Sequence, residues 1–240
     1  MTIVQSACGA WLDVKEEMTA RGLKLFIFGF HYTFSRQLFD HASVEFPMRQ
    51  RSSFAGVGRS SMDIHRLLET ADSQSMVLLS GVTRVVCVDF ARGIAVPFPN
   101  PAKQHLSPAL PSTTRRFPHI EVPESAPVWS FSTTVRVLYK DIDFNWHTNQ
   151  ASYTAFALEC AARAAVAGYY SRICDDVAFY TTLSLTCVHL AKSFVGDELK
   201  VSTWEDPTNA MLLHFLVQRQ QQRIFYVSIE FDERTVVSEL

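Results

Sequence analysis

One short stretch of the 240-residue sequence gathers side chains that can do chemistry. Residues 141–149 (DIDFNWHTN) hold two carboxylates, an imidazole and amides within nine positions, and an alanine-rich segment with high helix propensity follows. A helix N-terminus offers unpaired N–H groups and a partial positive charge, which suit a developing oxyanion. A carboxylate beside such a terminus can activate water or attack a carbonyl carbon. The stretch is therefore the first candidate for a functional site.

The patterns around this stretch predict the elements that hold it. Trp129–Asp141 alternates apolar and polar residues, as a half-buried strand does. Ala151–Ala167 is predicted to be a helix that Gly168 closes. Four β-rich segments follow, at Phe179–Ala191, Glu198–Trp204, Met211–Gln218 and Ile224–Phe231. This order of strand, helix and antiparallel meander predicts one sheet wrapped around one central helix.

The first part of the chain repeats this order without the opening strand. Val4–Ala20 is predicted to be an amphipathic helix closed by Gly22. The strands predicted after it are Leu23–Phe34, His41–Arg49, Ala55–Leu68 and Met76–Phe90. Aligning Gly22 with Gly168 places Leu12 on Leu158 and Asp13 on Glu159. The sequence therefore predicts two tandem copies of one α+β unit.

The clearest boundary between the copies is rich in proline. Eight of the ten prolines lie between Pro97 and Pro127, and proline fixes φ and lacks the N–H that a helix or central strand needs. We expect an incomplete first unit at residues 1–96, an extended linker at 97–127 and a second unit at 128–240. The polar stretch 141–149 is expected to be a loop, and it occurs only in the second unit. The chemistry is therefore expected in that unit, with the first unit as its packing partner.

Residues 139–159 resemble the hotdog thioesterase superfamily, in particular its acyl-ACP thioesterase and 4-hydroxybenzoyl-CoA thioesterase branches. The family pattern is an aspartate-x-aspartate that closes the first strand, a short loop with His-x-Asn, and a helix with a tyrosine and then an acidic residue. The matching residues here are Asp141, Asp143, His147, Asn149, Tyr153 and Glu159. The sequence departs from the family at Trp146, where members commonly have glycine. The resemblance covers nearly the whole chain as two copies, and it is most specific at 139–159.

The resemblance implies an α+β double-hotdog fold and hydrolysis of an acyl-CoA or acyl-carrier-protein thioester, as in lipid and fatty-acid metabolism, with no metal or other cofactor. It implies Asp143 as the first catalytic carboxylate and Glu159 as the second. His147 and Asn149 would then orient water or the thioester. The residues expected to contact the substrate are Trp146, Ser152 and Tyr153. Hotdog sheets commonly pair edge to edge, so pairing within the chain and a homo-oligomer both remain open.

Each of these roles has a structural alternative. Asp143 could cap the turn after the first strand and Asn149 the following helix, because both residue types favour such positions. Glu159 stands four residues before Arg163, the spacing of a surface ion pair, and His147 could be an exposed loop histidine. For the whole chain, one alternative is a non-catalytic hotdog module that binds acyl-CoA or a protein partner. The other is a member of the hydratase/dehydratase branch of the same fold.

The bulk composition narrows the remaining classes. The net charge of −2 and the absence of a basic run argue against a nucleic-acid surface. The five cysteines are odd in number and lack metal-ligand spacing, which is typical of reduced thiols in an intracellular protein. No signal peptide and no apolar run of membrane-spanning length is present, so a cytoplasmic location is expected. Because the first copy starts at its helix, we also expect an incomplete N-terminus, with any organelle signal lying upstream.

The remaining histidines with a recognisable context fall in strand patterns. His65, His189 and His214 are therefore expected to be sheet residues without a role in the chemistry.

Overall fold

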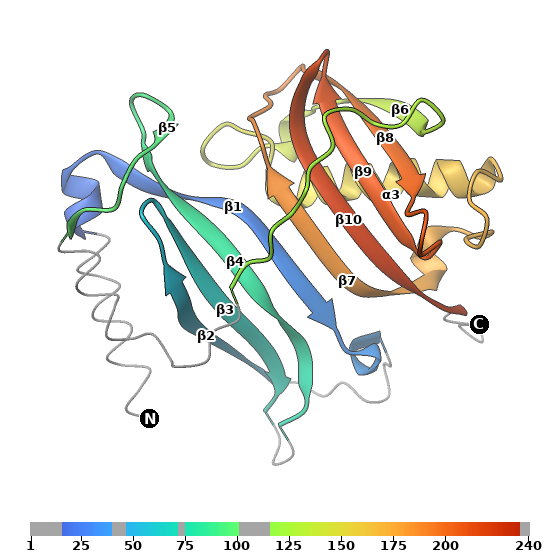
Figure 1. The fold of residues 1–240 in the computed structure, drawn as a ribbon, viewed down its shortest axis with the longest axis horizontal. Coiled ribbons are helices and arrows are strands. Elements are labelled where there is room, and N and C mark those ends of the chain that lie inside the picture. The colour runs from blue at the N-terminus through green and yellow to red at the C-terminus, as the bar shows by residue number, and fades with distance from the viewer. Residues whose placement is uncertain (1–15, 40–46, 72–74, 101–115, 236–240) are drawn as a thin grey trace. The chain divides into compact units, whose positions relative to one another are not determined.

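The computed structural model describes residues 16–39, 47–71, 75–100 and 116–235, without the side chains of residues 234 and 235 (Figure 1). The chain divides into two compact units, one that ends at His119 and one that begins at Ile120. Each unit contains antiparallel strands packed as a sheet.

The second unit places one long helix against one face of its sheet. It opens with β6 (Phe131–Arg136), the 3-10 turn η3 (Tyr139–Asp141) and α3 (Gln150–Val166). The elements that follow are η4 (Val177–Phe179), β7 (Tyr180–His189), β8 (Glu198–Glu205), β9 (Leu212–Arg219) and β10 (Gln222–Thr235). The strands lie in the order β7-β10-β9-β8-β6, with every pair antiparallel. Helix α3 crosses this sheet and contacts β6, β8, β9 and β10 (Figure 1).

Helix α3 begins and ends where its sequence dictates. The side chain of Asn149 accepts a hydrogen bond from the Ser152 N–H and caps the N-terminus. At the other end Gly168 adopts a φ of 67°, and the N–H groups of Gly168 and Tyr169 donate to the carbonyls of Ala165 and Ala164. Most of the buried residues of α3 are small, and the large ones are Tyr153 and Phe156. The small ones are Ser152, Ala157, Cys160, Ala161, Ala164 and Ala165. Small side chains let the helix lie close to the sheet.

The first unit has the same strand order after its helix. Its elements are β1 (Leu23–Phe34), η1 (Arg36–Phe39), β2 (Met48–Val57), β3 (Ser61–Thr70), β4 (Val77–Asp89) and β5 (Ile94–Ala95). The order β2-β3-β4-β1 corresponds to β8-β9-β10-β7 in the second unit, as the predicted repeat requires. A helical turn at 16–20 precedes β1 and ends at Gly22, which also has a φ of 67°. Within the described part of this unit, no strand corresponds to β6.

In the second unit the predictions for β7 to β10 were accurate and the one for β6 was too long, and in the first unit the strand predictions were partly wrong. The sequence pattern placed strands at 41–49 and 55–68, whereas β2 and β3 span 48–57 and 61–70. Residues 49–53 of β2 are all exposed and all polar, so that they resemble a loop in sequence. Residues 41–46 lie outside the described part of the chain, as do Leu12, Asp13 and most of the predicted helix at 4–20.

Each sheet has its own core. In the first unit the buried cluster is Met18, Phe54, Met62, Val85, Cys87 and Phe98. In the second, α3 covers one face, and on the other face Trp204, Leu216 and Tyr226 pack against Ile120, Val122 and Ala126. The guanidinium of Arg223 donates to the carbonyls of Val122 and Pro123, each at 3.3 Å. The end of the proline-rich segment is therefore held on the second sheet.

The described residues contain no disulfide, no cluster of metal ligands and no helix able to span a membrane. No cysteine there forms a disulfide, since Cys87, Cys160 and Cys187 are buried thiols and Cys174 is an exposed one. Across the same residues, no three His, Cys, Asp or Glu side chains come together as metal ligands would. Finally, none of the helices in the described ranges has the length and apolar character needed to cross a membrane.

Candidate functional site

The Asp141–Asn149 stretch forms a closed loop that leads into α3. Ile142 and Thr148 pair as an antiparallel bridge, and the Asp143 N–H donates to the His147 carbonyl at 2.8 Å. The tip is a four-residue turn in which the Trp146 N–H donates to the Asp143 carbonyl at 3.0 Å. Trp146 has a φ of 63°, in the left-handed region that glycine occupies most easily. A glycine at this position would adopt the same φ without the steric cost that tryptophan carries.

Asp143 lies at the start of this turn and borders an open pocket. Its Oδ1 accepts the Asn145 N–H at 2.8 Å, and its Oδ2 lies 3.4 Å from the Asn145 side-chain amide. This is the turn-capping role that the sequence left open for Asp143. The pocket holds about 290 Å³ and is lined by Tyr139, Ile142, Asp143, Phe144 and Trp146. The capping contacts are therefore compatible with a chemical role, because the carboxylate also borders the pocket.

Asp141 fastens the loop to its surroundings. It is only 6% exposed, and its Oδ2 accepts the Leu138 N–H at 2.8 Å. Its Oδ1 lies 3.5 Å from the Ser152 hydroxyl, and its carbonyl accepts the Asn149 N–H at 2.7 Å. A buried carboxylate with these partners ties the end of β6 to the first turn of α3.

His147 lies on the loop and makes an edge-to-face contact with Phe194, with the ring centroids 5.4 Å apart. Burial and then the positive charge of Lys192 lower the pKa of His147, while Asp143 acts in the opposite direction. A histidine pKa below its ordinary value leaves the imidazole neutral near pH 7, so that it can accept a proton or orient water.

The first turn of α3 has donors available for a ligand oxygen. The Asn149 N–H is used by the Asp141 carbonyl and the Ser152 N–H by the Asn149 side chain, at 2.7 and 2.8 Å. Asn149 therefore acts as the helix cap, which was the structural alternative for this residue. The N–H groups of Gln150 and Ala151 are the next in the turn, and the helix offers them no carbonyl partner.

Ser152 and Tyr153 lie on the buried side of α3, behind the loop. The hydroxyl of Tyr153 lies 2.7 Å from that of Ser193, and its ring stacks on Phe225 at 5.0 Å between centroids. Burial raises the pKa of Tyr153 above its ordinary value, so the phenol stays protonated. Neither residue lines the pocket beside Asp143, whereas Trp146 does.

Glu159 lies farther along α3, on the exposed side of the helix. Its carboxylate forms an ion pair with Arg163, the next turn along, and its side chain is 50% exposed. Such pairs contribute little to stability. Glu159 does not line the pocket beside Asp143.

Three polar residues of this region, Asn145, Thr148 and Ser193, were not predicted from the sequence. Asn145 binds both oxygens of Asp143, and its place between Asp143 and His147 was the only available signal. The hydroxyls of Thr148 and Ser193 lie 2.6 Å apart, although these residues are 45 positions apart in the chain. Two ordinary hydroxyl residues at that separation give no recognisable pattern.

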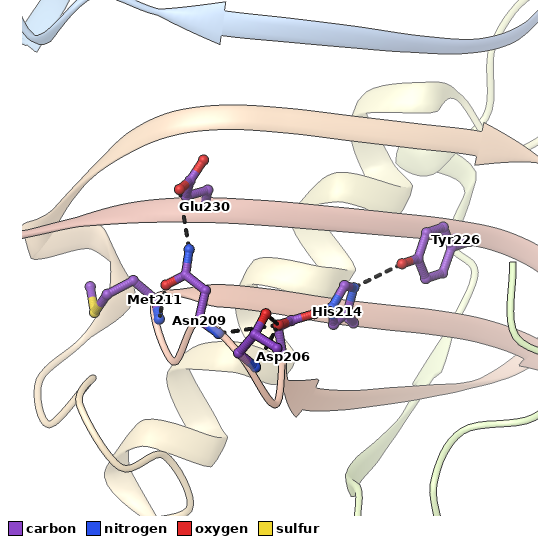
Figure 2. Close-up of polar contacts among 7 residues, drawn as sticks. Asp206, Asn209, Met211, His214, Tyr226 and Glu230 are labelled. Atoms are coloured by element: carbon purple, nitrogen blue, oxygen red, sulfur yellow. Dashed lines mark hydrogen bonds and ion pairs between the residues drawn. The ribbon is translucent and has the colours of Figure 1, made fainter. Parts of the chain in front are cut away.

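A second polar cluster lies at the turn between β8 and β9, and Figure 2 shows it. Asp206 Oδ2 lies 3.0 Å from His214 Nε2, and His214 Nδ1 lies 2.8 Å from the Tyr226 hydroxyl. Asp206 also accepts the N–H groups of Thr208 and Asn209. Burial alone would raise the pKa of Asp206, but the bonds from Thr208 and His214 lower it to about 2. These bonds join the turn between β8 and β9 to His214 in β9 and to the buried Tyr226 in β10.

Comparison with known proteins identifies solved structures of similar fold. No family model and no curated protein matches the sequence. Among solved structures, the 12:0-ACP thioesterase from Umbellularia californica is 14% identical with a TM-score of 0.69, and the match covers 90% of this chain and 78% of that one. A protein from Lactobacillus plantarum assigned as an oleoyl thioesterase is 12% identical with a TM-score of 0.68, covering 98% and 86%. An acyl-ACP thioesterase from Bacteroides thetaiotaomicron is 13% identical with a TM-score of 0.62, covering 97% and 90%.

These similarities confirm the predicted α+β fold, a double hotdog. At such low identities the likeness extends to the fold, and the chemistry has to be argued from the residues of this chain.

Proposed function

We propose that this protein is an acyl-thioester hydrolase that cleaves an acyl-CoA or acyl-carrier-protein thioester, with Asp143 as the carboxylate that activates water. The observation that carries the proposal is the position of Asp143, which borders an open pocket in a loop joined directly to the N-terminus of α3. The fold supports it, since structures of similar fold are described as acyl-ACP thioesterases.

The proposed hydrolytic cycle uses groups of this loop and of the first turn of α3. A water molecule gives a proton to Asp143 as its oxygen attacks the thioester carbon, with the neutral His147 orienting the water. The oxyanion that forms accepts hydrogen bonds from the N–H groups of Gln150 and Ala151, where the helix dipole also favours negative charge. The intermediate then breaks its C–S bond, and the leaving thiolate takes the proton from Asp143. These steps need no cofactor.

The environment of the two candidate carboxylates favours Asp143 over Glu159. Asp143 accepts its hydrogen bonds from neutral amide groups and borders the pocket. The carboxylate of Glu159 forms an ion pair with Arg163 on the exposed side of the helix. Trp146 supplies a wall of the pocket for the substrate, while Asn149, Ser152 and Tyr153 support the loop and helix from behind.

The test is turnover by purified protein on short, long and aromatic acyl-CoA thioesters and on acyl-carrier-protein thioesters. Asp143→Asn keeps the size of the side chain and removes the base, so kcat is expected to fall about 100-fold or more. Asp176→Asn is the matched control, because Asp176 also accepts the N–H two residues ahead, that of Ala178 at 3.0 Å. That variant should keep full activity.

Other outcomes would redirect the proposal. Activity that survives Asp143→Asn and disappears in Glu159→Gln would move the catalytic role to Glu159. Acyl-CoA binding by calorimetry without turnover of any thioester would favour a non-catalytic module.

A further inference from the structure

Ser193 joins three segments behind the candidate loop. It follows β7, it is completely buried, and its hydroxyl lies 2.6 Å from that of Thr148 and 2.7 Å from that of Tyr153. Its carbonyl accepts the Thr148 N–H at 2.9 Å and faces the Thr148 hydroxyl at 3.2 Å. One serine therefore connects the end of the loop, the first turns of α3 and the segment after β7.

The residues on either side of Ser193 in the chain, Lys192 and Phe194, both act on His147. Phe194 packs against the His147 ring, and the charge of Lys192 lowers the pKa of His147. The backbone of Phe194 is also held in place, because its N–H donates to Asp197 Oδ2 at 2.9 Å and Arg219 binds the same oxygen at 2.6 Å. The environment of His147 thus depends on how the segment 192–194 is anchored.

We propose that Ser193 is a positioning residue of the candidate site, which fixes the His147 imidazole relative to Asp143 through Thr148 and Phe194. Thr148 follows His147 directly, and the His147 carbonyl accepts the Asp143 N–H. A shift of Thr148 therefore changes both the imidazole and the start of the turn. This inference rests on the proposed function, but part of its test does not depend on turnover.

The rival explanation is that Ser193 is an ordinary buried hydroxyl whose removal only lowers stability. Ser202 provides the matched control for this case. It is also completely buried, in β8 of the same unit, and its hydroxyl lies 2.9 Å from that of Ser132. Ser193→Ala and Ser202→Ala remove the same atom from comparable surroundings, one beside the candidate site and one in the sheet.

The first measurement is steady-state kinetics on the best thioester found for the wild-type protein. Ser193→Ala is expected to lower kcat about 10-fold or more with less than a threefold change in KM, since it disturbs orientation and not the pocket. Ser202→Ala should leave both values unchanged. Thr148→Val removes the same bond from the loop side and should reproduce the Ser193→Ala effect, and the double variant should be no worse than either single one. Thr148→Val also serves if Ser193→Ala does not fold.

The second measurement is the NMR titration of the His147 ring, identified by the signal that is missing in His147→Gln. Loosening of Phe194 and Lys192 should raise the pKa of His147 toward its ordinary value in Ser193→Ala and Thr148→Val, and not in Ser202→Ala. An unchanged His147 titration in both site variants, or an equal change in Ser202→Ala, overturns the proposal. If the wild-type protein hydrolyses no thioester while the titration shifts as expected, the proposed function fails and the positioning role stands.

Discussion

The clearest local conflict between sequence and backbone is at Trp146. Its φ of 63° places an L-residue in the left-handed region, at a cost of about 1–2 kcal/mol. Its ring makes an edge-on contact with Tyr139 at 6.4 Å between centroids and is 66% exposed. This contact offsets little of the strain, and the ring also lines the pocket beside Asp143.

This conflict predicts an order of stabilities among variants of Trp146. Trp146→Ala loses the ring contact and keeps most of the strain, whereas Trp146→Gly loses the contact and the strain together. The relief of strain outweighs the greater chain entropy that glycine has in the unfolded state. We therefore expect the free energy of unfolding of the glycine variant to be about 1 kcal/mol higher than that of the alanine variant. Urea denaturation followed by circular dichroism measures the difference. An alanine variant more stable than the glycine variant by about 0.5–1 kcal/mol, the entropic cost of glycine alone, would show that the backbone is not strained.

At the scale of elements, the packing of α3 against β7 and β10 contains a largely buried imidazole whose Nε2 is inaccessible to solvent. The His189 ring lies 5.9 Å from that of Tyr153 and 4.8 Å from that of Phe225, and its Nε2 has no hydrogen-bond partner among the described residues. Burial lowers the pKa of His189 to about 4. The sequence predicted a sheet residue here, and the structure places His189 in β7 as expected.

This histidine makes the stability of the protein depend on pH. Between pH 6.5 and 4 the unfolded chain binds a proton at His189 and the folded chain does not, so stability falls as the pH falls, by about 3 kcal/mol in all. His189→Leu should abolish this loss and be at least as stable as wild type at pH 7, because a buried unpaired nitrogen disappears. Urea denaturation at pH 7.5 and 5 tests this, with the exposed His119 as control in His119→Leu. A wild-type protein equally stable at both pH values would contradict the prediction.

The sequence predicted those elements that have a strong periodic or capping signal. The predicted helix 151–167 differs from α3 by one residue at each end, because Asn149 and Gly168 mark its limits. The predicted first strand was too long, since β6 stops at Arg136 and the chain turns at 139–141. Strand β2 was misplaced because its middle is exposed and polar.

In the candidate site, too, the sequence predicted the parts that depend on local spacing. The loop could be identified from its local spacing, because Asp143, His147 and Asn149 all lie within it and need only a turn and a helix start to come together. Ser193 could not be found in this way, since it meets Thr148 only through the return of the chain along β7. Contacts of that kind depend on tertiary packing, and a single sequence does not carry them as a pattern.

At the scale of the whole molecule, the two units share a strand order and differ in what they carry. The second has the loop at the start of its helix, and the first has a buried ion pair on its sheet. Asp63 is 4% exposed and binds Arg84 through both oxygens, at 2.7 and 2.9 Å, and it accepts the Phe117 N–H at 3.1 Å. The Arg84 guanidinium lies over the Phe117 ring at 5.0 Å from its centroid. This cluster holds residue 117 on the first sheet.

Such a division of roles predicts that stability and chemistry can be separated. Asp63→Ala leaves Arg84 without its carboxylate and releases Phe117, so the free energy of unfolding should fall by about 3 kcal/mol, near the lower limit for buried pairs because Arg84 is partly exposed. Glu17→Ala, which breaks the exposed pair with Arg21, should cost less than about 1 kcal/mol. Under conditions in which both variants are folded, kcat on a thioester should stay within about twofold of wild type, because neither residue touches the groups that activate water. A fall in kcat for Asp63→Ala as large as that for Asp143→Asn would mean that the first unit takes part in the chemistry.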